Sequence, residues 1–246
     1  MEDILDEAES VRIITIVDNK TLSQDLQTAW GLSILVTIKG DKQYNVLMDT
    51  SGSVPAFFNN VDRLGIDVQD IDAIFITHRH GDHCGALPQV LQTIPRPVMV
   101  YVPSFRFFDT EALQRLGGIQ VVTDRPTRLL PGCMSTGNVG GGIDEHSLVV
   151  RVKGKGLVIL TGCSHPGVIR IIERAREASG DPRVYGVIGG FHVSGSAAKP
   201  IADYLKKLGV QRVSPCHCTS DDAKEIIKKT VGERYVANGS GLVLTI

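Results

Sequence analysis

The chain has 246 residues, of which 42% are hydrophobic and 22% charged, and its formal net charge is −1. This composition is typical of a globular protein with a sizeable core, and the charge gives no general attraction for nucleic acid or an anionic membrane. Residues 1–10 lack the basic and apolar regions of a secretory signal, and no apolar run approaches the ~18 residues of a membrane span. We therefore expect a cytoplasmic protein whose five cysteines are free thiols or metal ligands.

The first half of the chain predicts strands and helices in a mixed order. Alternating and buried apolar runs predict the strands, and apolar spacing of three to four residues predicts the helices. In chain order we expect a strand at 11–19, a helix at 23–31 ending at Gly31, a hairpin at 32–50 turning at 39–42, a helix at 54–66, a strand at 71–78, a helix at 85–94 and a strand at 97–103.

The second half repeats this succession. We expect strands at 118–124, 127–135, 145–152 and 156–162, then a helix at 166–179, a strand at 184–190, a helix at 196–208, a strand at 210–215, a helix at 220–230 and a last strand at 241–246. Two related halves predict one α/β domain over residues 1–246. Its expected architecture is a four-layer αββα sandwich, in which two mixed sheets pack face to face with helices outside.

The residues most typical of a chemical site lie in the loop after the strand at 71–78. His78, His80, Asp82 and His83 place four metal-binding side chains within six residues. Neutral imidazole and carboxylate together suit zinc, manganese or iron. Such density favours a metal site over a solvated polar turn.

The run His78-x-His80-x-Asp82-His83 resembles the signature of the metallo-β-lactamase-fold hydrolases, and residues 45–52 resemble their LxDtG element. The resemblance extends over almost the whole chain and implies the αββα fold. It also implies that His78 and His80 bind one metal ion, that Asp82 and His83 bind another, and that Asp49 supports these ligands from behind.

The same resemblance implies ligands from distant parts of the sequence. His217 stands where the family has the last histidine of its second metal. Cys163 stands where the family has a bridging aspartate, so it is either a thiolate ligand or a buried thiol. His165 and His146 are alternatives for the third histidine of the first metal, and we favour His165, which Pro166 holds at a helix entrance.

Three further residues near these candidates have less certain roles. His192 ends a strand after two glycines, and we expect it to face the substrate, to support a ligand or to be structural. Cys216 and Cys218 flank His217, and strand alternation predicts that both point away from it as packed thiols. The glycine-rich loop 137–142 either closes over the site or is a simple connection.

The segments around His146, Cys163, His192 and His217 are similar to a subgroup often labelled 7,8-dihydropterin-6-methyl-4-(β-D-ribofuranosyl)-aminobenzene-5′-phosphate synthase. The resemblance implies a metal-dependent hydrolase with one or two zinc ions, or iron or manganese, acting on an ester, lactone, thioester or phosphoester, or a related synthase. Metal-bound hydroxide would attack, Asp82 would orient it, and His192 or His165 would assist the leaving group.

The expected partner is a small molecule, with an anionic one among the candidates, rather than nucleic acid or a membrane, and the sequence leaves the oligomeric state open. The alternatives in function are an iron-dependent redox enzyme and a non-catalytic binding protein on the same fold.

Overall fold

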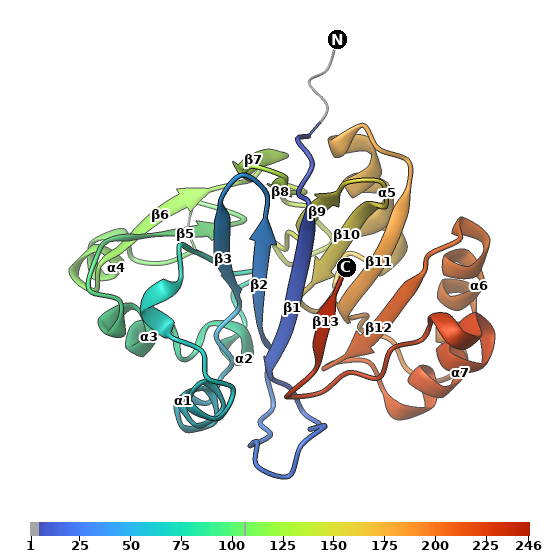
Figure 1. The fold of residues 1–246 in the computed structure, drawn as a ribbon, viewed down its shortest axis with the longest axis horizontal. Helices are drawn as coiled ribbons and strands as arrows, with labels where there is room; N and C mark the ends of the chain where they lie inside the picture. Colours follow the sequence, from blue (N-terminus) through green and yellow to red (C-terminus); the bar gives the residue numbers. More distant parts are fainter. Residues whose placement is uncertain (1–4, 106) are drawn as a thin grey trace.

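Two β-sheets pack face to face in the computed structural model, which describes residues 5–105 and 107–246 (Figure 1). The first sheet is antiparallel from β13 to β3 and parallel from β3 to β6. In spatial order its strands are β13 (Val243–Thr245), β1 (Ser10–Val17), β2 (Ser33–Lys39), β3 (Gln43–Met48), β4 (Ala73–Phe75), β5 (Val98–Val102) and β6 (Gly118–Val122).

The second sheet is parallel at one end and antiparallel at the other. Strands β10, β11 and β12 run parallel, whereas β7, β8, β9 and β10 pair antiparallel. In spatial order its strands are β12 (Arg212–Cys216), β11 (Val184–Gly190), β10 (Gly156–Thr161), β9 (Leu148–Val152), β8 (Cys133–Ser135) and β7 (Thr127–Leu130).

Helices cover the outer face of each sheet (Figure 1). The first sheet carries α1 (Val54–Arg63), α2 (Gly81–Cys84), α3 (Leu87–Thr93) and α4 (Thr110–Arg115), and the second carries α5 (Val168–Ser179), α6 (Ala198–Leu208) and α7 (Asp221–Val231). Short 3-10 turns are η1 (Val68–Asp70), η2 (Gly195–Ala197) and η3 (Gly232–Arg234). None of the helices in the described part of the chain is long and apolar enough to cross a bilayer.

Alternation along β10 shows how the sequence produces these layers. Val158 and Leu160 point into the core between the two sheets, while Ile159 between them points to the outer core under α5, α6 and α7. Since successive side chains of a strand face opposite sides, an uninterrupted apolar run is buried on both faces. The predicted four-layer αββα architecture is thereby confirmed.

The predicted helix at 23–31 is wrong, because this segment is irregular. The Asn60 side chain of α1 holds the backbone of Gln27, accepting from its N–H at 2.8 Å and donating to its carbonyl at 2.8 Å. These bonds replace those that a helix would make at Gln27. Gly31 has φ +147° and does not end a helix; a Cβ there would lie 2.5 Å from the carbonyl oxygen of Asp82. The helix α4, capped by Asp109, was not predicted.

The ends of strands from both sheets meet at one edge of the molecule. Strands β1 and β3 are both antiparallel to β2, so they end at the same side, and β4 is parallel to β3. Ligands commonly bind beyond the carboxyl ends of such strands. The polar residues that follow these ends are Asp18 and Asn19 after β1, Asp49 after β3, His78 after β4, Cys163 and His165 after β10, His192 after β11 and His217 after β12.

Candidate metal centre

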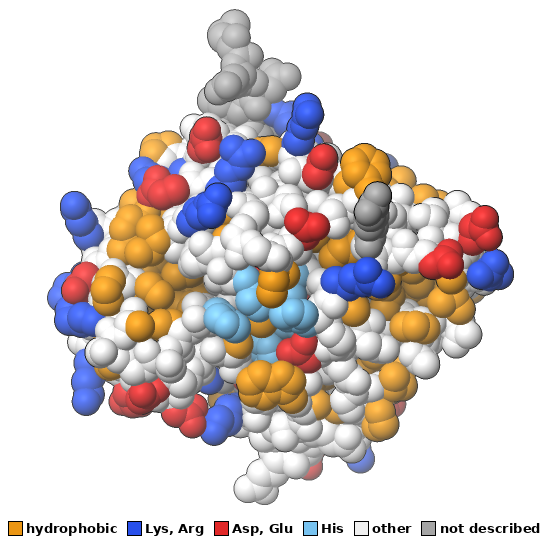
Figure 2. Space-filling model, turned by 180° about the vertical axis from the view of Figure 1, so that it is seen from behind, with side chains coloured by type: hydrophobic (Ala, Val, Ile, Leu, Met, Phe, Trp, Pro, Cys, Tyr) orange, Lys and Arg blue, Asp and Glu red, His pale blue; other side chains and the backbone are white. Residues whose placement is uncertain are grey.

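Histidine side chains gather near the middle of one face of the molecule (Figure 2). Their ring nitrogens, with two thiols and one carboxylate, form overlapping groups in which all donor atoms lie within 4.8 Å of one another. The groups are His78–His80–His165, His78–His83–Cys163, Asp82–His83–His217, Cys163–His217–Cys218 and Cys163–His165–His192. The structure therefore brings together the residues that the sequence analysis placed on the two metals.

The first group, His78–His80–His165, joins the two histidines of the HxH sequence, His78 and His80, to the segment after β10. His78 Nε2 lies 3.1 Å from His80 Nδ1, and the ring of His165 is 4.7 Å from that of His78 and 5.0 Å from that of His80. Burial and the neighbouring histidines lower the pKa of His78, so its ring is neutral and its lone pair is available. His165 thus occupies the third position beside the HxH pair.

A second group, Asp82–His83–His217, joins the same loop to the end of β12. His83 Nε2 lies 3.1 Å from His217 Nε2, and Asp82 Oδ2 lies 3.3 Å from His217 Nε2. Burial opposes ionisation of Asp82, but the hydrogen bond from His217 and the charges of His83 and His217 outweigh it and lower its pKa to about 2. Cys163 Sγ, 3.3 Å from His83 Nε2, lies between the two groups.

Four of these histidines share one orientation. In each, Nδ1 contacts a hydrogen-bond acceptor, which leaves Nε2 as the ring nitrogen available to a metal ion. The Nδ1 acceptors are Thr77 Oγ1 for His78 (3.0 Å), Asp49 Oδ2 for His83 (2.6 Å), Glu145 Oε2 for His165 (2.8 Å) and Asn19 Oδ1 for His217 (3.2 Å). Such partners favour a proton on Nδ1, which leaves Nε2 to bind a cation, either a metal ion or a second proton.

Facing lone pairs test whether a metal ion fits. The Nε2 atoms of His83 and His217 are 3.1 Å apart, and two lone pairs at this distance would repel each other, so a metal ion or a proton must lie between them. Burial alone would lower the pKa of His83, but the Asp49 carboxylate raises it, which again indicates a demand for positive charge. Imidazole nitrogens and a thiol are the donors that zinc prefers. The residues therefore fit a divalent metal ion.

Asp49 supports the cluster from behind, as the resemblance implied. Its buried carboxylate contacts His83 and accepts from the backbone N–H and the hydroxyl of Thr77, each at 2.8 Å. Burial raises the pKa of Asp49, and the contact with His83 opposes the rise. Asp49 thus connects ligand candidates of both groups, because Thr77 in turn holds His78.

Glu145 has a comparable position that the sequence analysis missed. Its fully buried carboxylate accepts from the backbone N–H groups of Cys163, Ser164 and His165, at 2.7 to 3.0 Å, and from His165 Nδ1. The carboxylate therefore fixes both the turn and the ring of His165. The available signal in the sequence was an acidic residue directly before His146, at the start of an apolar strand.

Asp18 and Asn19 were missed in the same way, since neither is part of a motif. Buried Asp18 accepts from the backbone N–H of His217 at 2.8 Å, and Asn19 donates to the carbonyl of His217 at 2.9 Å. Together they fix the backbone and ring of His217. Their only signal in the sequence is that two polar residues end the apolar run of the first predicted strand, at 11–19.

His146 lies outside the donor groups found among the described residues. Its Nδ1 contacts Thr123 Oγ1 and Ser135 Oγ, its Nε2 lies 2.9 Å from the carbonyl of Ile76, and its ring stacks on Phe75. Burial lowers the pKa of His146 to about 3, so the ring is a neutral core group. Of the two alternatives for the first group, the geometry favours His165.

His192 lies at the exposed side of the cluster, with its ring 4.6 Å from that of His165. Its backbone has φ +45°, in the left-handed region that non-glycine residues rarely adopt. Within residues 5–105 and 107–246, the non-glycine residues with positive φ are Asp49, Ser51, Ser164, His192 and His217. All five belong to the site or its loops, which is typical of backbone strain retained at functional positions.

The two cysteines that flank His217 behave differently. Cys216 is buried in the core between the sheets, as expected. The expectation for Cys218 is wrong, because its Sγ lies within 4.8 Å of donor atoms of His217 and Cys163. The left-handed conformation of His217, with φ +50°, ends the strand alternation on which the expectation depended.

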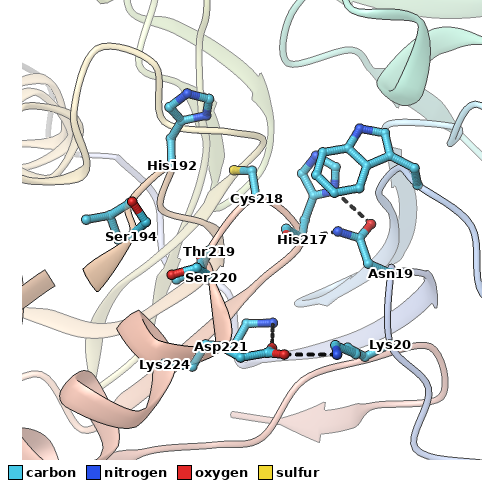
Figure 3. Close-up of a pocket in the computed structure, with 12 residues that line it drawn as sticks. Asn19, Lys20, His192, Ser194, His217, Cys218, Thr219, Ser220, Asp221 and Lys224 are labelled. Atoms are coloured by element: carbon cyan, nitrogen blue, oxygen red, sulfur yellow. Dashed lines mark hydrogen bonds and ion pairs between the residues drawn. The ribbon is translucent and has the colours of Figure 1, made fainter. Parts of the chain in front are cut away.

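A pocket of about 590 Å³ opens beside His217 and Cys218 (Figure 3). Trp30, 67% exposed, forms part of its wall, with its ring 5.3 Å from that of His217. Lys20 and Lys224 line the pocket on its far side, and both are paired with Asp221. The pocket thus offers an aromatic surface and basic groups next to the donor cluster.

Comparison with known sequences agrees with this geometry. The family model described as the metallo-beta-lactamase superfamily matches residues 31–217. The chain is also 26% identical to the 7,8-dihydropterin-6-methyl-4-(beta-D-ribofuranosyl)-aminobenzene-5'-phosphate synthase of Methanocaldococcus jannaschii, with 96% of this chain and 97% of the relative covered. This relative confirms the resemblance to the subgroup of that name.

Solved structures show the same fold. Tm1679, described as a metal-dependent hydrolase of the beta-lactamase superfamily, aligns with a TM-score of 0.78 and 27% identity over 95% of this chain and 98% of its own. The metallo-beta-lactamase fold protein YhfI from Bacillus subtilis has a TM-score of 0.65 at 13% identity, over 96% and 99%, and shares the fold alone. The family match covers most of the chain and includes the donor cluster from His78 to His217. The chain therefore belongs to the metallo-beta-lactamase superfamily.

Proposed function

We propose that this protein is a metal-dependent hydrolase of a small, anionic, ring-bearing substrate, with zinc as its metal. The observation that carries the proposal is the set of Nε2 lone pairs facing one centre, with Cys163 Sγ between the two histidine groups. Nitrogen and sulfur donors favour zinc over magnesium or manganese. When bound, such an ion acidifies water and polarises a carbonyl or phosphoryl oxygen.

The chain's own residues supply the remaining roles. Asp82, with its low pKa and a side chain 20% exposed, is ionised at neutral pH and can accept a hydrogen bond from an attacking water. His192 is exposed beside His165 and can donate a hydrogen bond to the leaving group. The two residues are therefore assigned to opposite ends of the bond that breaks.

The pocket beside the cluster supports the substrate class. Trp30 offers a flat apolar surface, and beyond it Lys20 and Lys224 share the single carboxylate of Asp221, which leaves a net positive charge. The Methanocaldococcus relative is named for a product that contains a pterin and a phosphate. A planar ring against Trp30 with an anionic group toward the lysines fits this wall. A synthase reaction on such a molecule is the second candidate, because the relative bears that name over nearly the full length of both chains.

The test begins with protein freed of metal by chelation and then reloaded with zinc, iron(II) or manganese. We expect zinc to restore hydrolysis of at least one member of a panel of phosphodiesters, phosphomonoesters, thioesters and lactones. Metal content is measured in the same samples and in protein as isolated. Stoichiometric iron with negligible zinc, together with no hydrolysis by the zinc-loaded protein, would overturn the proposal and favour redox chemistry.

Replacing Trp30 tests the substrate wall. Trp30→Ala is expected to raise KM for a ring-bearing substrate about 10-fold with little change in kcat, because an aromatic contact contributes roughly 1 kcal/mol beyond its buried area. Trp30→Phe should retain most of the affinity. Ile119→Ala, an exposed apolar residue at the start of β6, is the control and should leave KM unchanged. A wild-type KM in Trp30→Ala would remove Trp30 from the binding surface.

A further inference from the structure

We infer that Cys218 is a second sulfur ligand of the metal centre, so that one ion is held by Cys163, Cys218 and His217. The inference rests on the metal centre of the proposed function and specifies its donors. It departs from the ligand set that the resemblance implied, in which the histidines and Asp82 hold the second ion. The sulfur donors come from the ends of two parallel neighbours of β11, namely β10 and β12.

The distances between the donors support this assignment. The two Sγ atoms and a ring nitrogen of His217 all lie within 4.8 Å of one another, as they must to share one ion. Cys218 Sγ also lies 3.4 Å from the carbonyl oxygen of Cys163. His83 can complete a tetrahedron, because its Nε2 is 3.1 Å from His217 Nε2 and 3.3 Å from Cys163 Sγ.

The backbone around Cys218 is shaped to bring its sulfur to this place. The left-handed turn at His217 directs Cys218 toward the cluster, and Figure 3 shows Cys218 between His192 and His217. Gly190 leaves the necessary room, since a Cβ there would lie 2.6 Å from Cys218 Sγ and 2.4 Å from the carbonyl oxygen of Gly162. Any side chain at position 190 would therefore displace the sulfur.

Two thiol donors change what the centre binds. On binding a divalent ion, each thiol releases its proton to solvent and forms a metal–sulfur bond, with no change in oxidation state. Two thiolates balance the charge of that ion and favour zinc or iron(II) over magnesium and manganese. With His83 and His217 committed to the sulfur-bound ion, the Asp82 carboxylate is left to hold water or substrate.

The experiment counts metal–sulfur bonds in the full-length protein. Zinc-loaded protein is measured by X-ray absorption, in which sulfur at ~2.3 Å separates from nitrogen at ~2.0–2.1 Å, and cobalt-loaded protein by its thiolate charge-transfer absorption. Cys218→Ala is expected to lose one-third to one-half of both signals, depending on whether Cys163 contacts one ion or two. The double variant Cys163→Ala/Cys218→Ala should lose both signals completely.

Cys216→Ala is the matched control, because Cys216 flanks His217 on the other side but lies in the core. It should keep the full sulfur signal, and circular dichroism of each variant verifies its fold. Unchanged sulfur signals in folded Cys218→Ala would overturn the inference and leave Cys163 as the sulfur donor beside the histidines. If Cys218→Ala loses the expected share of the sulfur signals while the zinc-loaded wild-type protein hydrolyses nothing on the panel, the inference is upheld and only the proposed function is rejected.

Discussion

His83→Asn is expected to lower the bound metal by about one ion per chain and kcat/KM by at least roughly 1,000-fold. The amide nitrogen of asparagine can take the place of His83 Nδ1 and keep the hydrogen bond to Asp49, while Nε2 is removed. The loss exceeds the 10–100-fold typical of residues that only orient ligands, because Nε2 faces both His217 and Cys163. Elemental analysis and initial rates measure the two effects.

His146→Asn is the matched control for this experiment. His146 is as deeply buried as His83, but its ring contacts Thr123, Ser135 and Ile76 rather than the cluster. The control is expected to lower the free energy of unfolding by about 1–3 kcal/mol, because buried polar groups lose a partner, and to keep its metal. Full metal content in His83→Asn, or metal loss in His146→Asn, would reverse the assignment of the two histidines.

The layers of the fold could be predicted because a strand that is buried on both faces has apolar residues at nearly every position. The runs of β10 and β11 are apolar at almost every position, and both strands are covered by sheet on one side and helices on the other. The helix expected at 23–31 failed for a reason outside its own sequence. Asn60, more than thirty residues away, holds the backbone of Gln27 in an irregular conformation.

In the candidate site too, some residues could be predicted from the sequence and others could not. His78, His80, Asp82 and His83 are visible because they are adjacent in sequence. Cys218 was expected to point away from His217 as a packed thiol. This prediction failed because the alternation rule holds only while the backbone is extended, and the backbone turns left-handed at His217. The choice between His165 and His146 needed three-dimensional contacts, since both follow or precede strands of the same sheet.

Residues that orient the donors were the hardest to predict. Asp18, Asn19 and Glu145 lie on segments up to about two hundred residues from the groups they hold, so no local spacing connects them. Only the folded chain shows that the buried carboxylate of Glu145 is balanced by backbone N–H groups and a histidine. This balance makes Glu145 the most informative of the three to change.

Glu145→Gln is expected to lower the free energy of unfolding by about 3–5 kcal/mol and metal affinity about 10–100-fold. If the amide oxygen takes the place of Oε1, it keeps the N–H groups of Cys163 and Ser164, but the NH₂ group then faces the two N–H donors of His165. The ring of His165 avoids this repulsion by moving its proton to Nε2, so the ring loses the lone pair available to a metal ion beside His78 and His80, while the backbone N–H of His165 still faces the NH₂ group. Chemical denaturation and competition with a chelator measure the two effects.

Asp181→Asn separates stability from metal binding in this experiment. Asp181 is also a buried carboxylate, 3% exposed, but it binds Arg151 and Arg183 at the other end of the second sheet. Its replacement should destabilise the fold by a comparable amount while leaving metal affinity unchanged, because none of its partners touches a donor. Equal metal affinity in Glu145→Gln and Asp181→Asn would show that Glu145 stabilises the turn without positioning His165. A fall in metal affinity in Glu145→Gln but not in Asp181→Asn would establish that the Glu145 carboxylate determines which ring nitrogen of His165 carries the proton.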